Sequence, residues 1–415
     1  MNRGFACACV WLLSIGCSTT SDPDPGQTNK GGAGGSAGSL PAQAGAGSSN
    51  VAGGGSAAAG AGAGGGSGGL VGAAGAVGSA GNPGSAGGGA GGAGSAGNPG
   101  SAGSTGSAGG GSVAFTCPAG PFPAFMAPSG MAAKIAGTPP ADSFNKDAWT
   151  NVEGPVWIGD SLYFSEMTNS NMIPPARILK IAPGGAVSVF SADSGSNGLA
   201  VDGSGNLLAA RHKDGSISQI ALSGGAATPL ISMYNGKRFT SPNDLAIRSD
   251  GTIYFSDPSY QNSANPQMGE RLYRATPPPA RTVSVIADTP STPNGVTLSP
   301  DEKTLYVSGS GLKKFSVMSD GSVGAGSDFV AGSGGDGMAV DCAGNVFVTG
   351  NNAATVRVYS PAGALLGTIQ TAGGGNSTNV AFGGADHKTL YITAQGTEGQ
   401  RGVYSIALSV PGFPY

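Results

Sequence analysis

The sequence is poor in charged residues. Asp, Glu, Lys and Arg make up 10% of its 415 residues, the formal net charge is −3, and Lys and Arg form no cluster. Nucleic-acid binding relies on a basic patch that neutralises phosphate groups. We therefore expect no nucleic-acid partner.

Residue types on which many catalytic and metal sites depend are also scarce. His212 and His387 are the two histidines of the chain. They do not supply the His and Cys cluster of a zinc site, and no Gly-x-Ser-x-Gly motif or Ser-His-Asp spacing predicts a nucleophilic serine. The composition thus disfavours zinc enzymes and serine hydrolases.

Cysteine is rare, and its five positions fall into two groups. Cys7, Cys9 and Cys17 lie near the N-terminus, whereas Cys117 and Cys342 lie further along the chain. A pair of cysteines in an exported protein is typical of a disulfide, but two separate buried thiols fit the sequence equally well. Both states stay open, because the sequence does not show whether the two Cα atoms come within bridging distance.

Residues 1–17 have the features of an export signal. Arg3 precedes an apolar run of roughly a dozen residues, too short for a membrane span and suited to a signal peptide. The run ends at Ser14-Ile15-Gly16-Cys17, which resembles a bacterial lipobox with its Leu one position early. We expect Cys17 to carry the lipid anchor of an envelope lipoprotein at the outer membrane or periplasmic side. The alternative is an ordinary signal peptide and a secreted protein.

Residues 18–112 consist almost wholly of Gly, Ala and Ser. A segment without large apolar side chains cannot bury enough surface to offset the chain entropy lost on folding. We expect a disordered tether with a typical reach of about 55 Å. Its glycines account for much of the total of 78, which therefore says little about the folded part.

What the chain does have is a repeat. A short strand that opens with an acid or amide, a turn, and a second strand of alternating apolar residues recur six times. The copies begin 42 to 51 residues apart, at Glu153, Asn197, Asn243, Asn294, Asp336 and Asn379. A period of about 40 to 50 residues with short strands is typical of a β-propeller of four-stranded blades.

We therefore predict an all-β fold, a six-bladed β-propeller over residues 113–415. The copy NDLAIRSDGTIYFSDP shows the pattern best, with strands expected over 245–247 and 252–256 around the turn Ser249-Asp250-Gly251. A propeller closes by pairing its first and last blades, and either 115–149 or the final strand 403–408 can do so. Oligomeric state is not encoded in any recognisable motif, and a monomer is favoured.

The repeat also predicts where chemistry occurs. The innermost strand of each blade runs along the central channel, so equivalent residues form a ring at one mouth of that channel. The ring consists of Glu153, Asn197, Asn243, Asn294, Asp336 and Asn379. Carboxylate and amide oxygens suit Ca²⁺ better than Zn²⁺, which predicts a calcium-type divalent site on the axis.

The second strand of each hairpin returns to the same mouth, because the two strands are antiparallel. This geometry places a second set of side chains there, namely Glu166, His212, Asp257, Ser310 and Asn351. His212 either caps its strand or acts on substrate as a base or hydrogen-bond donor. His387, in a turn at the far end, is expected on the surface.

Two longer connections, 234–241 and 260–267, are expected to form walls or a lid at the mouth. The first contains Lys237 and Arg238. Arg238 is either a solvated loop charge or a group that binds a carboxylate or a polyhydroxylated substrate.

Five segments resemble the gluconolactonase and regucalcin family of six-bladed propellers, in the order and at the spacings of that family, over residues 151–408. They are EGPVW from Glu153, SPNDLAIRSDGTIYFSDPSY from Ser241, PNGVTLSPDEKTLYVS from Pro293, GDGMAVDCAGNVFVT from Gly335 and TNVAFGGADHKTLYITA from Thr378. The resemblance implies a calcium-type cation bound by Glu153, Asn294 and Asp336, with Asn243 contacting metal or substrate.

The resemblance further implies that Asp336 transfers a proton and that Arg238 binds substrate. Asn197 and Asn379, which have no matching metal role, are assigned to substrate together with His212. One feature departs from many bacterial members, because no Arg closely follows His212. This departure concerns the substrate more than the metal.

The expected function is therefore metal-assisted hydrolysis of a small lactone, with Ca²⁺ or another divalent cation polarising the carbonyl and Asp336 assisting the attack of water. The alternative is a non-catalytic propeller that binds a ligand and holds calcium for structural reasons, since the fold alone does not establish activity.

Overall fold

The computed structural model describes residues 115–135, 149–168, 173–261, 269–350, 352–397 and 399–413. The expected signal (1–17) and tether (18–112) lie outside these ranges, as does Asn351. All regular structure within them is β, and they contain no helix long and apolar enough to cross a membrane.

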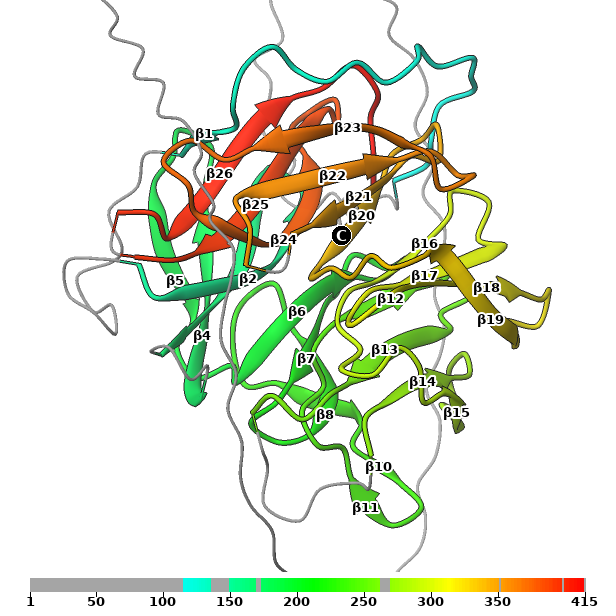
Figure 1. Cartoon of the computed structure of the whole chain (residues 1–415). Helices are drawn as coiled ribbons and strands as arrows, with labels where there is room; N and C mark the ends of the chain where they lie inside the picture. The colour runs from blue at the N-terminus through cyan, green and yellow to red at the C-terminus, as the bar shows by residue number, and fades with distance from the viewer. Residues whose placement is uncertain are drawn as a thin grey trace, which may run out of the picture. The chain divides into compact units, whose positions relative to one another are not determined.

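Six antiparallel four-stranded sheets surround a common centre (Figure 1), which confirms the predicted six-bladed propeller. Blade 1 contains β2 (Asn151–Ile158), β3 (Ser161–Thr168), β4 (Ile173–Ile181) and β5 (Val187–Ser191). Blade 2 contains β6 (Ser196–Val201), β7 (Leu207–Arg211), β8 (Ser216–Ile220) and β9 (Thr228–Ile231). Blade 3 contains β12 (Leu245–Ile247), β13 (Ile253–Asp257), β14 (Arg271–Ala275) and β15 (Val283–Ala287).

The remaining blades follow the same order. Blade 4 contains β16 (Val296–Leu298), β17 (Thr304–Val307), β18 (Leu312–Val317) and β19 (Val323–Val330). Blade 5 contains β20 (Met338–Val340), β21 (Val346–Thr349), β22 (Thr355–Tyr359) and β23 (Leu365–Gln370). Blade 6 contains β24 (Asn376–Gly383), β25 (Thr389–Gln395) and β26 (Gly402–Ala407). A separate hairpin pairs β10 (Met233–Tyr234) with β11 (Lys237–Arg238).

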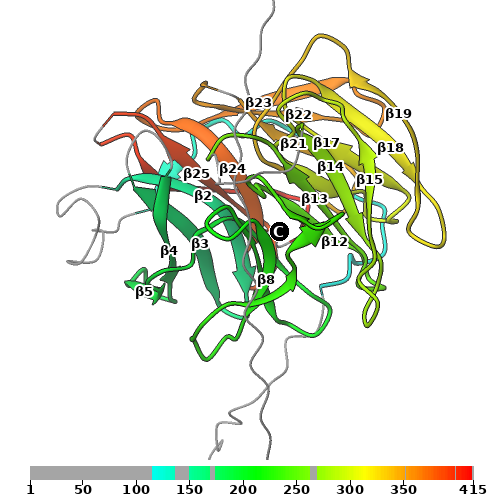
Figure 2. The same ribbon diagram turned by 90° about the horizontal axis from the view of Figure 1, so that it is seen from below.

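The first strand of every blade lies innermost, and each innermost strand contacts that of the next blade, from β2 round to β24 and back to β2. Figure 2, turned by 90°, shows blade 1 on one side and β14, β15, β18 and β19 on the other. Equivalent repeat positions therefore lie at equivalent distances from one axis.

The ring is closed by a segment that precedes the first blade. β1 (Ala133–Lys134) pairs with β26 and completes blade 6 as its outermost strand. The cyan segment of Figure 1 accordingly lies beside the red β26. Both segments that the sequence left open thus contribute to closure, with 402–407 as the third strand and the N-terminal segment as the fourth.

The apolar core is divided into six layers, one between each pair of neighbouring blades. The layer between blades 2 and 3 contains stacked aromatic rings, with Phe239, Phe255 and Tyr273 fully buried. These layers follow from the alternation in each strand, because alternate side chains face the neighbouring sheet on either side. The polar residues that face the axis therefore lie at the ends of the innermost strands.

The end of the propeller away from the ring is tied by a disulfide. Cys117 and Cys342 are bonded across 225 residues, with their Cα atoms 5.4 Å apart. His387 lies nearby, and its ring stacks on Phe115 with the centroids 4.1 Å apart. It is half-buried, and burial lowers its pKa, so the expectation of a simple surface histidine was wrong.

Candidate axial site

Glycine follows the ring residue in four of the six repeats, and this glycine lets the ring close tightly. A Cβ on Gly337 would come 2.0 Å from the side chain of Asn379 in the next blade. At Gly154 a Cβ would come 2.3 Å from the Asn197 carbonyl oxygen, and the backbone there has φ +51°. The small residue is therefore required by the close approach of one innermost strand to the next.

Hydroxyl groups on the second strands lock the ring from blade to blade. Each donates a hydrogen bond to a backbone carbonyl at or next to the ring residue of the following blade, and three of the four bonds are fully buried. These bonds run from Ser165 to Asn197, from Ser256 to Asn294, from Ser308 to Asp336 and from Thr349 to Thr378. Each such bond contributes about 1 kcal/mol to stability, and together they hold the innermost strands in fixed positions at the mouth.

A pocket of about 220 Å³ lies on the axis at this mouth. Its walls carry five of the six predicted ring residues together with three groups from neighbouring loops and strand ends. The lining residues are Glu153, Asn197, Asn243, Tyr260, Asn294, Asp336, Asn352 and Gln395. The six-fold repeat thus brings side chains that are far apart in sequence into one polar pocket.

Negative charge is concentrated at this site. Burial, followed by the charges of Asp336 and Asp244, raises the pKa of Glu153 well above its ordinary value. Burial and the neighbouring Asp244 raise the pKa of Asp336 to about 7, and burial raises the pKa of Asp244 to about 7 as well. Asp244 is close enough to raise the pKa values of both Glu153 and Asp336, and a bound cation would stabilise the ionised forms of these carboxyl groups.

The donor set fits a hard cation such as Ca²⁺. Oδ1 of Asn197 is buried and has no hydrogen-bond partner among the described residues, so this pocket-lining oxygen is left for a ligand. In the described part of the chain, no three His, Cys, Asp or Glu side chains form a metal-binding group by themselves. A cation here must therefore use amide oxygens beside the carboxylates, as Ca²⁺ does and Zn²⁺ rarely does.

Asp244 is a participant that the repeat analysis passed over. It occupies the position where four other copies have glycine, and only 5% of its surface is exposed. Its Oδ1 accepts from Leu245 N at 2.9 Å and its Oδ2 from Val296 N at 3.2 Å, so it joins blade 3 to blade 4. The signal that could have revealed it is this single acid within a row of glycines.

Three residues assigned to substrate lie outside the walls of the pocket. Asn379 is hydrogen-bonded to both Glu153 and Asp244, which positions the two carboxylates. Arg238 donates from Nη2 to the carbonyl of Lys213 at 2.9 Å. His212 is buried, and neither ring nitrogen has a hydrogen-bond partner among the described residues. Burial and the charge of Arg211 lower its pKa to about 4, which keeps the ring neutral.

Two acids expected at the open mouth are instead enclosed by protein. Glu166 is fully buried and accepts from Arg177 Nε at 2.7 Å and from Thr150 N at 3.1 Å. Asp257 is fully buried and accepts from the backbone N–H groups of residues 240 and 241. Both carboxylates anchor the segments that surround the mouth, because a buried acid needs donors of its own. They lie near the ends of β3 and β13, as the hairpin geometry predicts, but they are enclosed by protein and are not open groups of the mouth.

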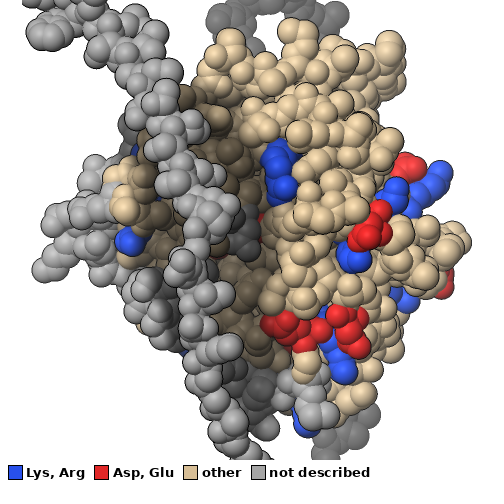
Figure 3. Space-filling view, in the orientation of Figure 1, with Lys and Arg blue, Asp and Glu red and all other residues tan. Residues whose placement is uncertain are grey.

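The face of the propeller drawn in Figure 3 carries little charge. The face seen in Figure 3 shows scattered Lys, Arg, Asp and Glu, with both signs side by side and no broad patch of one sign. This distribution fits the low charge content of the sequence. It contrasts with the axial site, where Glu153 and Asp336 line the pocket and Asp244 adds its charge.

Fold and site together define the class of protein, a six-bladed β-propeller with a carboxylate and amide pocket at one mouth of its channel. Residues 152–396 match the family described as SMP-30/Gluconolactonase/LRE-like region. The chain belongs to this family, and the resemblance seen in the sequence is confirmed.

Named relatives agree with this assignment. A gluconolactonase of Zymomonas mobilis is 32% identical over 279 residues, which cover 58% of this chain and 75% of that protein. A gluconolactonase structure from Xanthomonas campestris matches with a TM-score of 0.55 and 29% identity, over 71% of this chain and 98% of that one. The calcium-binding protein regucalcin of Agrobacterium tumefaciens matches with a TM-score of 0.55 over 65% and 94% of the chains; at 17% identity it supports the fold alone.

Proposed function

We propose that the chain is a divalent-cation-dependent lactonase that opens sugar lactones by hydrolysis. The observation that carries the proposal is the convergence of Glu153, Asp336 and several amides in one axial pocket. Membership of the gluconolactonase-containing family and the named lactonase relatives support the substrate class.

The residues that would hold the cation are Glu153, Asn243, Asn294 and Asp336. A bound Ca²⁺-type ion would supply Lewis-acid polarisation of the lactone carbonyl. Amide groups on the pocket wall, such as that of Asn197, bind the hydroxyl groups of the sugar ring. The pocket is small and fixed by bonds between blades, so the substrate is held in one orientation.

Asp336 acts as the general base. Its carboxyl group lines the pocket, where it can accept a proton from the attacking water. The water oxygen forms a bond to the carbonyl carbon, the bond from that carbon to the ring oxygen breaks, and the ring oxygen takes up the proton. The product is the open hydroxy acid, and water is the only co-reactant.

The test is hydrolysis of D-glucono-1,5-lactone by the purified chain, measured as acid release above the spontaneous rate. We expect activity that disappears with a chelator and returns with added Ca²⁺. If calcium stabilises the protein but no lactone is opened faster than in buffer, the chain is instead the non-catalytic binding propeller. Activity that a chelator leaves intact would remove the cation from the proposal.

We also propose that residues 1–17 direct export and that Cys17 carries a lipid anchor, because the lipobox-like segment ends there. Membrane attachment would then depend on the thiol of Cys17. The variant Cys17→Ala, expressed in a bacterial host, is expected in the soluble fraction. Sedimentation of the variant with membranes would contradict the lipid anchor.

A further inference from the structure

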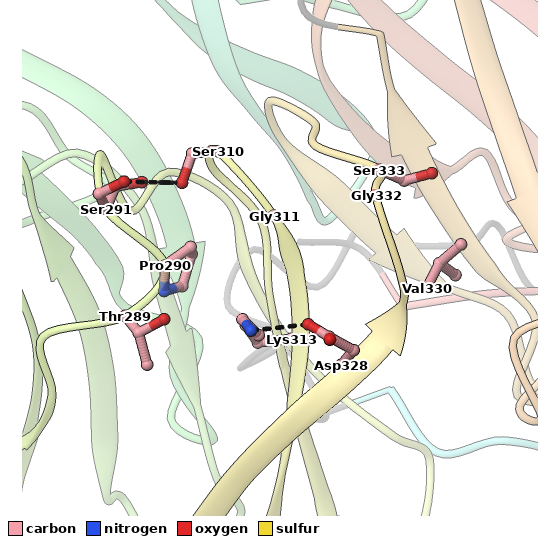
Figure 4. Close-up of a pocket in the computed structure, with 10 residues that line it drawn as sticks. All are labelled: Thr289, Pro290, Ser291, Ser310, Gly311, Lys313, Asp328, Val330, Gly332 and Ser333. Carbon is pink, nitrogen blue, oxygen red and sulfur yellow. Dashed lines mark hydrogen bonds and ion pairs between the residues drawn. The ribbon is translucent and has the colours of Figure 1, made fainter.

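A second hollow, of about 290 Å³, lies on blade 4 (Figure 4). One side is formed by the loop 289–291, which leads from blade 3 into blade 4. The other sides come from β18 with the turn before it and from β19 with the loop after it. The hollow is not part of the axial pocket, since the two share no lining residue.

Chain connectivity nevertheless places the hollow beside the axial site. Ser291 stands three residues before Asn294, and Ser333 stands three residues before Asp336. Three residues span at most about 10 Å, so both walls of the hollow lie within that distance of axial residues. The hydroxyl of Ser308, two residues before Ser310, donates to the Asp336 carbonyl. The hollow and the axial site are thus joined by short stretches of chain.

Tyr260 links the axial pocket to the loop that forms one side of the hollow. It lines the axial pocket, its side chain is 39% exposed, and its hydroxyl donates to the Thr292 carbonyl at 3.1 Å. Thr292 is fixed in turn by Glu270, whose Oε2 accepts from its backbone N–H at 2.7 Å. An exposed aromatic ring offers an apolar platform beside polar groups, which suits the C–H face of a sugar.

The lining of the hollow favours a neutral, hydroxyl-rich ligand. Figure 4 shows Ser291 and Ser310 hydrogen-bonded through their hydroxyls, at 2.8 Å, and Lys313 paired with Asp328 at 2.6 Å. The pair cancels its own charge, so an ionic ligand gains little, whereas its polar atoms and the serine hydroxyls can exchange hydrogen bonds with a polyol. The ring of Pro290 adds an apolar surface.

The sizes of the spaces point the same way. Pockets for drug-sized ligands hold about 300 to 1,000 Å³, so the axial pocket of about 220 Å³ has room for one sugar ring only. The hollow adds about 290 Å³. A third depression of about 300 Å³, lined by Glu270, Arg271 and Asp288, shares Ser291 with the hollow and continues it over blade 3.

We infer that the substrate is the lactone of an oligosaccharide, with the aldonolactone ring in the axial pocket and a glycosidically linked neutral sugar in the hollow. This inference rests on the proposed lactonase function. The reaction at the lactone is unchanged, and the glycosidic bond stays intact.

The test compares kcat/KM for D-glucono-1,5-lactone with that for maltobiono-1,5-lactone and cellobiono-1,5-lactone. We expect at least one disaccharide lactone to be preferred by about tenfold, mainly through KM, since the added contacts bind substrate and transition state alike. Gluconolactone activity without any preference for a disaccharide lactone overturns the inference and leaves the lactonase function standing. Absence of activity on all three lactones overturns the lactonase function itself.

The variant Gly311→Leu gives the structural control. A Cβ at Gly311 would meet Lys313 at 3.8 Å and Pro290 at 4.0 Å, which are ordinary contacts with side chains that line the hollow, so a larger side chain here is expected to occupy the hollow. We expect it to abolish the disaccharide preference and leave gluconolactone activity within about twofold. Gly203→Leu, in the turn after β6 where no atom lies within 4 Å, is the matched control and should change neither rate. Equal loss on both substrates in Gly311→Leu, with an unchanged melting temperature, would contradict the inference.

Discussion

The two ends of blade 5's innermost strand carry the same residue type in opposite situations. Asp336, before β20, lines the axial pocket beside Glu153, and burial raises its pKa to about 7. Asp341, after β20, accepts hydrogen bonds from the backbone of Ala343 at 3.0 Å and from both nitrogens of Asn345 at 2.8 Å. One carboxylate is satisfied by the fold itself, whereas the other is placed where a ligand can satisfy it.

The residues around these two aspartates differ in the same way. Around Asp341 the chain is tied by Cys117–Cys342 and by the C-terminal segment, where Cys342 N donates to Pro411 O at 2.8 Å. Around Asp336 a buried oxygen of Asn197 has no hydrogen-bond partner among the described residues, and the charges of Asp336 and Asp244 raise the pKa of Glu153. The comparison indicates that one end stabilises the propeller and that the mouth accepts the destabilising groups that function requires.

The largest effect on activity is expected when each of the two aspartates is replaced in turn. Asp336→Asn keeps the shape and one oxygen but removes a negative charge and the proton acceptor, so lactone turnover should fall by about 10² to 10⁴-fold. Asp341→Asn should lower stability while leaving kcat of the folded protein near the wild-type value. Steady-state kinetics on D-glucono-1,5-lactone at saturating Ca²⁺, with chemical denaturation alongside, measures both. Near-normal turnover in Asp336→Asn would show that this residue is not the base.

The next largest effect is expected at the end that carries the disulfide, and it concerns stability alone. The double variant Cys117→Ser/Cys342→Ser opens a loop of 225 residues and should lose about 2 to 5 kcal/mol of unfolding free energy. Activity per folded molecule should be unchanged, because the disulfide is at the opposite end from the axial pocket. Guanidinium unfolding of wild type and variant checks this. Unaltered stability would show that β1 and the C-terminal segment close the ring without the disulfide.

The buried acids at the mouth should also change the pH dependence of the protein's stability. Burial raises the folded-state pKa values of Asp244 and Asp336 from 3.8 to about 7, so over this range the folded chain binds more protons than the unfolded chain. Stability must then fall as the pH rises. His212 acts in the opposite sense, but its contribution is complete above its ordinary pKa of 6.5.

We therefore expect the chelator-treated protein to melt at a lower temperature at about pH 8 than at about pH 6.5. Calcium should reverse this loss, since it binds the ionised carboxylates. Thermal scans with and without Ca²⁺ at both pH values give the comparison. A metal-free protein that is more stable at the higher pH would argue against buried, uncompensated acids at the mouth.

A smaller change should follow from the ring residue without a metal role. Asn197→Ala removes an amide that lines the pocket, so KM should rise by several-fold, with a weaker effect on kcat than Asp336→Asn. Initial-rate measurements over a range of lactone concentrations separate the two parameters. A loss of kcat as large as that of Asp336→Asn would assign Asn197 to the reaction centre itself.

No effect on stability is expected when the Gly/Ala/Ser-rich segment that precedes the propeller is deleted. Deletion of residues 18–112 should leave the melting temperature unchanged, because a Gly/Ala/Ser-rich tether contributes no packing. Calorimetry on the truncated and full-length chains measures this. A fall of many degrees would show that the segment packs against the propeller.

The sequence predicted the features that repeat. Six copies predict six blades, and equal repeat positions predict one ring, because each innermost strand occupies an equivalent place around the axis. The strand 245–247 was predicted with its bounds, and 252–256 was displaced by one residue from β13. The disulfide was left open because Cα distances between blades depend on the complete ring.

Features that break the repeat could not be predicted in the same way. β1 is two residues long, and only its pairing with β26 makes it a strand. Tyr260, Asn352 and Gln395 reach the pocket from loops or strand ends whose course depends on neighbouring blades. Glu166 carries a charge at the predicted place, but its enclosure by Arg177 and Thr150 arises from tertiary packing.

The most direct test is calorimetric titration of Ca²⁺ into chelator-treated protein. We predict one site per chain in the wild type, a much weakened site in Asp336→Asn and in Glu153→Gln, and wild-type affinity in Asp341→Asn at the opposite end. This pattern follows if the repeat-equivalent residues of different blades build a single axial site. Unchanged calcium affinity in both Asp336→Asn and Glu153→Gln would contradict that site.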